Sequence, residues 1–524
     1  MSEDSFLYMI DSMVKTCKWF ALQAVLFFLM PYVWNYDYSA STLVLMLIYT
    51  TLYAVYWNFV PTDKQVRLLW LPYIIYVVIG IMVYCATSGW CSSLWQVILL
   101  PLYGAICFVG VKLFKKGVHM LRKRFRFGGL MAYALLVLFF AVLKGISVAY
   151  MKPSRGGVEE ERTDIIARRD YLQGKLLTSP KRVINLMPSI VGEQFQGEWA
   201  LYSCSMLAAS LVNISELYPD TRDENLQSIS QLVEIVMSSE LRRYDAMRWG
   251  EDPLETLDGS KSHVSYLSHL AWMICGYKRV GGDGRYDELL ASLCATMNRR
   301  ILNSEGMNLQ TYPGELVYVP DMLVAIVALK QYADMNDGKY RSTVQQWMRR
   351  AQREWIDKET GLLVSFLLES GSQVEGLPIK GSYSALNCYY LTLIDKDFAQ
   401  KQYTQLKSLC WKDGLLSGLK EYWNRTCLFG LDIDAGPILL ELSPSGTAFF
   451  AGAATYFGDE EVRHDILTTA EAAGHTIVIG NKRHYLLANV ALVGEAIMLA
   501  MRTHTMNHLI AKNVVVDVEE DVFT

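Results

Sequence analysis

The chain has 524 residues, room for two or three domains, and a net charge of −4. This charge provides no basic face, so nucleic acid is excluded as an expected partner. The chain is 52% hydrophobic and 19% charged. The apolar excess comes from roughly the first 150 residues, and the remainder has the composition of a soluble globular protein.

Five N-terminal segments are apolar and long enough to cross a bilayer, which takes about 20 residues. They are Lys18–Trp34, Ser41–Val60, Leu68–Thr87, Leu94–Phe114 and Gly128–Tyr150. A cleavable signal peptide does not fit, because further spans follow the first apolar run. The sequence therefore predicts a bundle of about five transmembrane helices over residues 1–152, with the lipid bilayer as its partner.

Lysine and arginine in the short loops orient this bundle. Basic residues precede the first span and occupy the second and fourth loops, where the run from Lys115 to Arg126 is dense. The first and third loops have none. Because basic loops stay on the cytoplasmic side, the N-terminus is expected in the cytoplasm. After an odd number of crossings, the C-terminal part is expected to be extracytoplasmic.

A repeat of about 60 residues follows a charged connector over residues 153–195. In each unit an apolar helix ends in a turn with an aspartate, and a more charged helix comes next. The turn aspartates, each expected to cap the following helix, are Asp220, Asp283, Asp337, Asp397 and Asp459. The predicted apolar helices are Glu198–Leu217, Ser262–Val280, Pro320–Met335, Ser382–Ile394, Ser445–Phe457 and Ala488–Thr503.

This repeat predicts an all-α fold. Five apolar helices have a charged partner after them, and Glu161–Leu177 is the expected sixth partner. Six inner and six outer helices make an (α/α)6 toroid over residues 196–510, followed by an acidic tail over residues 511–524. An open superhelix of helical hairpins is the alternative. The long segments precede the inner helices, so a site is expected on the face where the inner helices begin.

The first group of candidate residues lies before the third inner helix. Glu315, Tyr312 and Tyr318 precede this helix, and Asp321 lies in its first turn. A carboxylate in a first turn also simply matches the helix dipole, and the tyrosines can be packing residues. Both readings are open from the sequence.

Further candidates fall on the same expected face. Asp432 and Asp434 alternate in a segment expected to be extended, so they point to opposite sides. Tyr383 and Asn387 lie one turn apart in the fourth inner helix. The set is completed at the first two inner helices by Glu198, Trp199, His263 and Tyr266.

Paired carboxylates suggest acid/base chemistry. Glycosidic bond cleavage requires one protonated acid and one ionised base or nucleophile, and aromatic faces suit sugar rings. The candidate acid/base residues are Asp434, Asp321, Glu315 and Asp432, and the other candidates would bind substrate.

The ten cysteines form no CxxC pair and no zinc-type spacing, so most are expected to be buried free thiols. His504 and His508 have a spacing compatible with a metal, but they lie off the expected site face. They are expected to form a solvated helix end. No metal and no cofactor are predicted.

Four motifs between Tyr312 and Asp459 carry a family resemblance. They are Val319-Pro-Asp-Met-Leu-Val-Ala-Ile, Gly381-Ser-Tyr-Ser-Ala-Leu-Asn, Asp432-Ile-Asp-Ala-Gly-Pro and Ser443-Pro-Ser-Gly. This stretch resembles a family of bacterial membrane-anchored proteins without a settled activity. The helical domain is also similar to linalool dehydratase/isomerase, a periplasmic (α/α)6 barrel with acid/base residues that include cysteines. The resemblance implies a multi-pass protein of the bacterial inner membrane with a periplasmic domain, and it assigns no catalytic residue.

Three functions remain open from the sequence. The first is an anchored enzyme that acts on a glycan or glycan-lipid through carboxylates. The second is a lyase or isomerase for a small apolar alcohol, with Cys388 or Cys427 facing a closed apolar bore. The third is a non-catalytic component of the cell envelope that binds a partner. Because toroids host many reactions, fold alone does not choose between them.

Overall fold

The computed structural model describes residues 158–188, 192–414, 416–432, 435–489 and 491–504. The five predicted spans, Asp434, His508 and the acidic tail lie outside the described residues.

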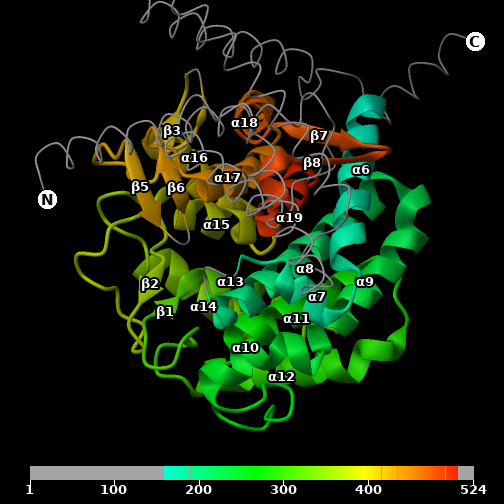
Figure 1. Cartoon of the computed structure of the whole chain (residues 1–524). Coiled ribbons are helices and arrows are strands. Elements are labelled where there is room, and N and C mark those ends of the chain that lie inside the picture. The colour runs from blue at the N-terminus through cyan, green and yellow to red at the C-terminus, as the bar shows by residue number, and fades with distance from the viewer. Residues whose placement is uncertain (1–157, 189–191, 415, 433–434, 490, 505–524) are drawn as a thin grey trace, which may run out of the picture. The chain divides into compact units, whose positions relative to one another are not determined.

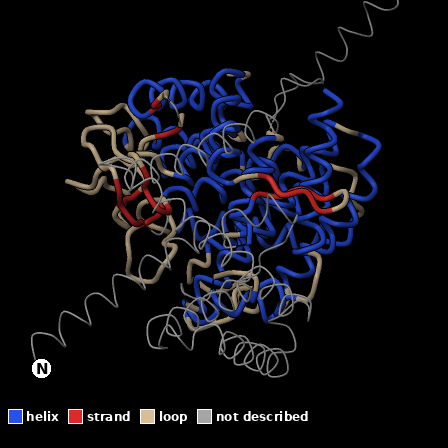
Figure 2. The backbone as a smooth tube through the Cα atoms, turned by 45° about the horizontal axis from the view of Figure 1, so that its top comes forward, coloured by secondary structure: helices blue, strands red, loops and turns tan. Residues whose placement is uncertain are grey.

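The described chain is mostly helical (Figures 1 and 2), which confirms the all-α expectation at this level. The helices are α6 (Val158–Leu176), α7 (Pro180–Asn185), α8 (Glu193–Leu217), α9 (Arg222–Met237), α10 (Ser239–Trp249), α11 (Val264–Arg279), α12 (Asp287–Asn303), α13 (Val319–Met335), α14 (Arg341–Glu354), α15 (Gly381–Thr392), α16 (Lys396–Cys410), α17 (Pro444–Phe457), α18 (Glu460–Gly474) and α19 (Leu492–Arg502). The strands are β1 (Val317–Tyr318), β2 (Phe366–Leu367), β3 (Trp411–Lys412), β4 (Gly418–Leu419), β5 (Phe429–Asp432), β6 (Gly436–Leu439), β7 (Thr476–Ile479) and β8 (Lys482–Tyr485). Figure 2 shows the strands as short pieces among many helices.

Six helices contact one another in a closed cycle. The order of contact is α8, α11, α13, α15, α17 and α19, and α19 packs back against α8. These inner helices are the six apolar helices expected from the sequence. Helix α13 shows why they lie inside, because every residue over 319–329 is buried. A helix that is apolar all round has no face for water and must be covered by other helices.

A second set of helices covers the first. Helices α9, α12, α14, α16 and α18 each follow an inner helix and pack against it, and α6 packs against both α19 and α8. Helix α14 presents one buried stripe, formed by Val344, Trp347, Met348 and Ala351. This spacing of three and four residues matches a helix with one face in the core and one in water.

The turns between inner and outer helices match the sequence in part. Asp283 and Asp459 each accept a backbone N–H and so cap the next helical segment, as expected. Helix α16 is capped by Asp395, and Asp397 lies inside its first turn. No side-chain cap bond forms at the start of α9 or α14, and Asp337 has a left-handed φ of 48°. The capping expectation is therefore wrong for Asp220, Asp337 and Asp397.

The cycle has two distinct ends. The C-terminal ends of all six inner helices line one pocket, so they lie together. We name this the turn end, because the turns after the inner helices are short. The opposite end, where the inner helices begin, is the loop end. Its long segments carry α10 and the antiparallel pairs β1–β2, β3–β4 and β5–β6.

The expectation of a solvated helix end is wrong for His504. This residue lies two positions after the end of α19 and is buried. Its ring stacks on Tyr456 with centroids 5.1 Å apart, and it meets the ring of Tyr389 edge to face at 4.9 Å. The sequence around His504 looks polar, but the aromatic residues that cover it lie on α15 and α17.

Among the described helices, α8 is long and apolar enough to cross a membrane by length and composition. Within its most apolar window, 78% of the residues are buried inside the structure. It contacts α9, α10, α11 and α19. These contacts are those of a core helix.

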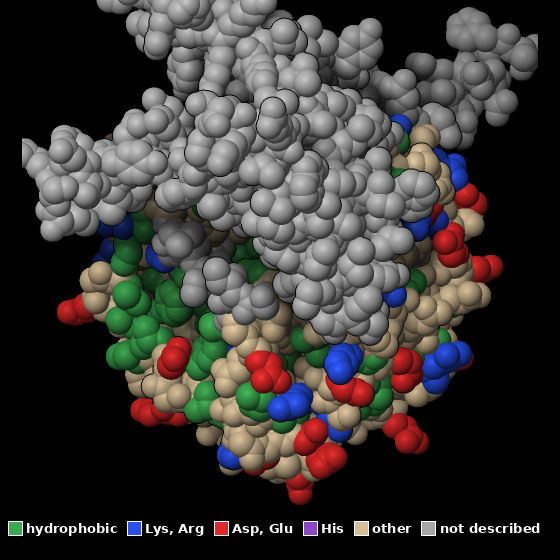
Figure 3. All heavy atoms as spheres, viewed as in Figure 1, with side chains coloured by type: hydrophobic (Ala, Val, Ile, Leu, Met, Phe, Trp, Pro, Cys, Tyr) green, Lys and Arg blue, Asp and Glu red, His purple; other side chains and the backbone are tan. Residues whose placement is uncertain are grey.

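Figure 3 shows how the surface residues are distributed on one face. Hydrophobic side chains gather on the left, on the side where Figure 1 places β2 and β5. Exposed apolar residues of these segments include Leu368, Leu377, Leu428 and Phe429. Acidic and basic side chains are interspersed over the rest of the visible described surface.

Candidate functional site

A buried carboxyl group lies at the loop end. Asp321 is in the first turn of α13, where Pro320 occupies a position that needs no backbone N–H. The side chain is 1% exposed. Its Oδ1 accepts a 2.7 Å hydrogen bond from the Tyr202 hydroxyl of α8, and its Oδ2 accepts one of 2.7 Å from the Thr311 hydroxyl.

Burial raises the pKa of Asp321 to about 6. The nearby Glu198 carboxylate contributes to this rise, whereas the hydrogen bonds from Thr311 and Tyr202 and the charge of Arg248 act to lower the pKa. The hydrogen bonds from Tyr202 and Thr311 come from neutral hydroxyls, and the nearest cation, Arg248, is paired with Glu198 and not with Asp321. Asp321 is therefore a carboxyl group that can be protonated near neutral pH.

A second carboxylate at the loop end has a different environment. Glu198 of α8 forms a two-bond ion pair with Arg248 of α10, at 3.3 and 3.0 Å. The Tyr312 hydroxyl donates a 3.0 Å bond to Glu198 Oε2, and the Arg248 guanidinium lies 3.9 Å from the Tyr312 ring centroid. Burial alone would lower the pKa of Arg248, but the Glu198 carboxylate raises it above its ordinary value.

Tyr312 and Thr311 join the two carboxyl groups. These neighbours in sequence bind Glu198 and Asp321 respectively. One carboxyl thus has a cation and the other has only hydroxyls. Two carboxyls whose environments differ in this way are the usual basis for separate acid and base roles.

Aromatic rings lie next to this pair of carboxyls. Tyr318 meets Tyr383 edge to face with centroids 5.5 Å apart, and Phe366 contacts both rings. The pairing of Tyr318 with Phe366 in β1–β2 brings these side chains together. The Lys380 ammonium lies 5.0 Å from the Tyr383 ring centroid. Trp199, adjacent to Glu198, is half-buried.

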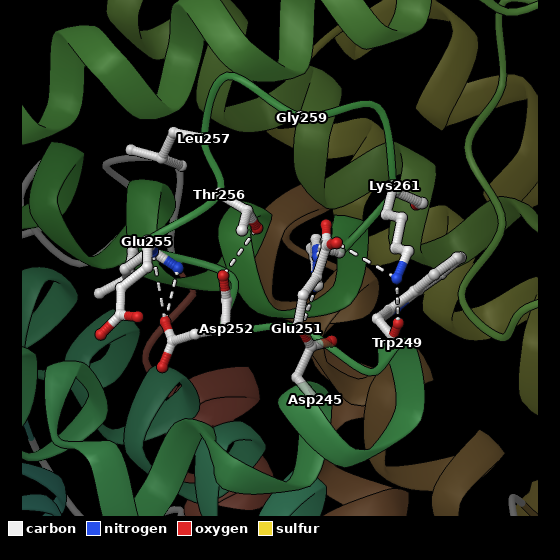
Figure 4. Close-up of polar contacts among 12 residues, drawn as sticks. Asp245, Trp249, Glu251, Asp252, Glu255, Thr256, Leu257, Gly259 and Lys261 are labelled. Carbon is white, nitrogen blue, oxygen red and sulfur yellow. Dashed lines mark hydrogen bonds and ion pairs between the residues drawn. The ribbon is translucent and has the colours of Figure 1, made fainter.

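His263 belongs to a separate polar cluster that closes the loop before α11. Its Nδ1 lies 2.5 Å from Asp245 Oδ2, and its Nε2 lies 3.4 Å from Glu251 Oε1. Figure 4 shows Glu251 and Lys261 meeting across the loop, in an ion pair of 3.1 Å. His263 has a left-handed φ of 50° and is fully buried. These contacts fix the loop geometry.

The other predicted residues lie apart from the Asp321 cluster. Glu315 is exposed on a turn. Tyr266 is buried and donates to the Val236 carbonyl of α9, so it points to the outer layer. Asn387 donates to the loop carbonyl of Leu363. The backbone of Asp432 ends β5, where it pairs with Gly436.

Several residues of the site escape sequence reasoning. Tyr202, Thr311 and Arg248 complete the two carboxyl environments. Tyr202 lies 119 residues from Asp321 and Arg248 lies 50 residues from Glu198, whereas Thr311 lies 10 residues from Asp321. Glu421 is fully buried and accepts bonds from the backbone and hydroxyl of Ser382 at the start of α15. Only Tyr202 had a local signal, because it lies one turn after Glu198 on α8.

His269 on α11 adds an uncharged polar group beside Tyr202. The two rings lie 4.4 Å apart between centroids. Neither His269 nitrogen, nor the Tyr390 hydroxyl, has a hydrogen-bond partner among the described residues. Burial lowers the pKa of His269 to about 3, so its ring is neutral. A neutral imidazole can donate one bond and accept one from a small polar group.

Within the described residues, no group of three His, Cys, Asp or Glu side chains could hold a metal ion. The six described cysteines are free thiols, and five of them are buried. The thiol of Cys388 donates to the Ala399 carbonyl of α16, so it points to the outer layer. Burial raises the pKa of this thiol above its ordinary value.

Comparison with known proteins adds no assignment. No protein-family model matches the chain. A search of curated proteins also found no match.

Proposed function

We propose that this protein is a membrane-anchored, extracytoplasmic enzyme that processes a glycan or glycan-lipid by carboxylate acid/base chemistry. In this proposal Asp321 is the acid and Glu198 is the ionised partner. Tyr202 and Thr311 position Asp321, and Arg248 with Tyr312 positions Glu198.

The observation that carries the proposal is the environment of Asp321. A buried carboxyl group without a cation costs stability, so its retention beside a second carboxylate favours a chemical role. Its pKa of about 6 suits a group that gives and takes a proton near neutral pH. Tyr318, three residues before Asp321, and Phe366 are half-buried aromatic residues at the same end of the cycle, and aromatic faces suit the apolar side of a sugar ring.

The proposed architecture is an (α/α)6 toroid behind about five transmembrane helices. The closed cycle of six inner helices and the covering position of α6 support the toroid over an open superhelix. The alternation of basic and neutral loops supports a cytoplasmic N-terminus and a periplasmic domain in a bacterial inner membrane.

The structure gives less support to the other two functions. An apolar-alcohol lyase of the linalool dehydratase/isomerase type would need a cysteine in the bore, but Cys388 bonds to the outer layer. A purely structural component would be expected to pair its buried carboxylates with cations, as Glu198 is paired and Asp321 is not.

The test is turnover by the purified full chain. Envelope glycans and glycan-lipids are supplied, and released saccharides are measured by mass spectrometry. Asp321→Asn is expected to lower kcat by at least about 100-fold, because it removes the acid without changing its shape. Glu240→Gln, an exposed carboxylate-to-amide change on α10, is the matched control and is expected to leave kcat unchanged. Wild-type kcat in the Asp321→Asn variant would contradict the proposal, as would the absence of glycan turnover in the wild type.

A further inference from the structure

A pocket lies at the turn end, opposite the Asp321 cluster. Its volume is about 430 Å³, within the range of small-molecule sites. Every inner helix contributes to its lining, either from its last turns or from a residue within two positions of its end. Examples are Glu216, Arg279, Lys330, Leu393, Tyr456 and His504. A smaller hollow that shares part of this lining reaches Trp272 and Tyr389.

Two ion pairs form part of the pocket wall. Arg279 Nε lies 2.6 Å from Glu216 Oε1, and Lys330 Nζ lies 2.9 Å from Asp334 Oδ2. The four side chains are 37 to 49% exposed. Exposed ion pairs contribute little to stability, so a ligand can exchange for either partner at small cost. The wall therefore offers two cations and two carboxylates to a single ligand.

The pocket also has an aromatic, uncharged side. The ring of Tyr456 stacks on His504, whose Nε2 lies 2.7 Å from the Thr392 hydroxyl. Burial lowers the pKa of His504 to about 3, so this histidine brings no positive charge. The six helix C-termini present partial negative charge toward this end, and that charge favours a cation. A tyrosine face attracts an ammonium group as well.

We propose that the turn-end pocket binds a zwitterionic headgroup in which a phosphate is joined to an ammonium, as in phosphoethanolamine. The phosphate lies against Arg279 and Lys330. The ammonium lies toward Glu216, Asp334 and the ring of Tyr456. A ligand that carries only a phosphate would draw the cations away from Glu216 and Asp334 and leave these carboxylates without a partner. A ligand that carries only an ammonium would do the same to Arg279 and Lys330.

Chain connectivity favours a phospholipid as the source of this headgroup. Near the start of α6, Arg162 pairs with Asp220 and lies over the ring of Tyr218, and both belong to the turn after α8. The described part of the chain therefore begins at the turn end. This step rests on the proposed membrane anchor, whereas the headgroup chemistry rests on the pocket alone.

The first test is isothermal titration calorimetry on the purified full chain in a nonionic detergent. Dihexanoylphosphatidylethanolamine is expected to bind saturably. Arg279→Gln is expected to raise Kd about tenfold, since it removes a charge-assisted contact to the phosphate. Arg285→Gln is the matched control. Arg285 is exposed and ion-paired, as Arg279 is, but it does not line the pocket. Leu393→Trp is expected to fill the pocket and abolish binding, with thermal unfolding measured to confirm that the variant is folded.

Two further probes separate the parts of the proposal. Dihexanoylphosphatidylglycerol has the phosphate but no ammonium and is expected to bind at least about tenfold more weakly. Glycerophosphoethanolamine has no acyl chains, so equal affinity would assign a free headgroup and weaker affinity would assign a lipid. The proposal is overturned if neither ethanolamine probe binds, if the glycerol lipid binds equally, or if Arg279→Gln leaves Kd unchanged.

Alkaline carbonate extraction of membranes tests the anchor independently. Release of the chain with headgroup binding retained would remove the anchor and leave the pocket assigned to a free headgroup.

Discussion

At the residue scale, Asp321 couples stability to pH. Its pKa in the folded chain is about 6, above an unfolded value of about 3.9. Because folding favours the neutral form, the stabilising contribution is complete below about pH 4 and is lost as pH rises through about 6. A shift of about two units corresponds to about 3 kcal/mol.

The Asp321→Asn variant should therefore gain stability relative to the wild type as pH rises from about 4 to 6. Asparagine stays neutral at both ends of this range, so the difference is expected to approach about 3 kcal/mol. Chemical unfolding of both chains across this pH range measures the difference. If the unfolding free energies of the two chains change in parallel with pH, the pKa of Asp321 is not raised in the folded chain.

Unlike Asp321, Glu198 is buried together with a cation, so its contribution to stability depends on Arg248. Arg248→Met leaves this carboxylate buried without its cation, which is expected to cost about 3–5 kcal/mol of unfolding free energy. Arg243→Met on the same helix removes an exposed pair with Glu193 and is expected to change stability by less than about 0.5 kcal/mol. Equal effects of the two substitutions would show that the Glu198–Arg248 pair has no special weight.

At the element scale, the approach of α10 to α8 depends on Gly197. A Cβ atom at this position would lie 2.5 Å from the Cβ of Tyr244 on α10. Gly197→Ala is expected to push α10 outward, to cost about 1–3 kcal/mol and to weaken the Glu198–Arg248 pair. The cost is measured by chemical unfolding.

Gly494→Ala in α19 is the control for this substitution. No atom lies within 4 Å of the added Cβ, so alanine is expected to stabilise the helix by up to about 1 kcal/mol. If Gly197→Ala stabilises the chain as Gly494→Ala does, then α8 and α10 do not approach closely at Gly197, and the prediction is wrong.

The helices themselves could be predicted from sequence, whereas the site could be predicted only in part. Apolar residues on every face marked the inner helices such as α13, and a single stripe marked outer helices such as α14. Helix α10 was missed, although Ser238 and Gly250 cap its two ends, because its residues follow no clear apolar period. Asp321 and Glu198 were identified as candidates from their positions at helix starts.

The partners of these residues could not be predicted. Tyr202 and Asp321 are 119 residues apart, and Glu198 and Tyr312 are 114 apart. Contacts across such distances depend on which inner helices are neighbours in the cycle, and one sequence does not encode that order locally. Tyr266 and Asn387 are predicted on the site face from their positions near helix starts. Their side chains instead bond to α9 and to a loop, because position along a helix does not determine which neighbouring element covers a side chain.

At the scale of the whole molecule, a buried ionic network joins the first described helix to the last. Asp164 of α6 binds Arg168, Arg483 and Arg502, and Arg168 also binds Glu495 of α19. Burial by itself would raise the pKa of Asp164, but the arginines hold it below its ordinary range. This network keeps α6 against α19 and β8.

Acid is therefore expected to loosen α6 selectively. The pKa of Asp164 is lowered in the folded chain, so its stabilising contribution is present above about pH 4 and is lost as pH falls below that value. Hydrogen-exchange protection of α6, relative to α14, should fall as the pH is lowered below about 4. Asp164→Asn should make this fall shallower, and an equal loss of protection in both helices would argue for global acid unfolding instead.

The central claim is that Asp321 is a protonatable acid inside the folded chain. Infrared difference spectra of the wild type against Asp321→Asn isolate the carbonyl stretch of this one carboxylic acid. The account predicts that the band is present at acidic pH and disappears with a midpoint near pH 6. A carboxyl group that is already ionised at about pH 4, as an ordinary aspartate is, would contradict it.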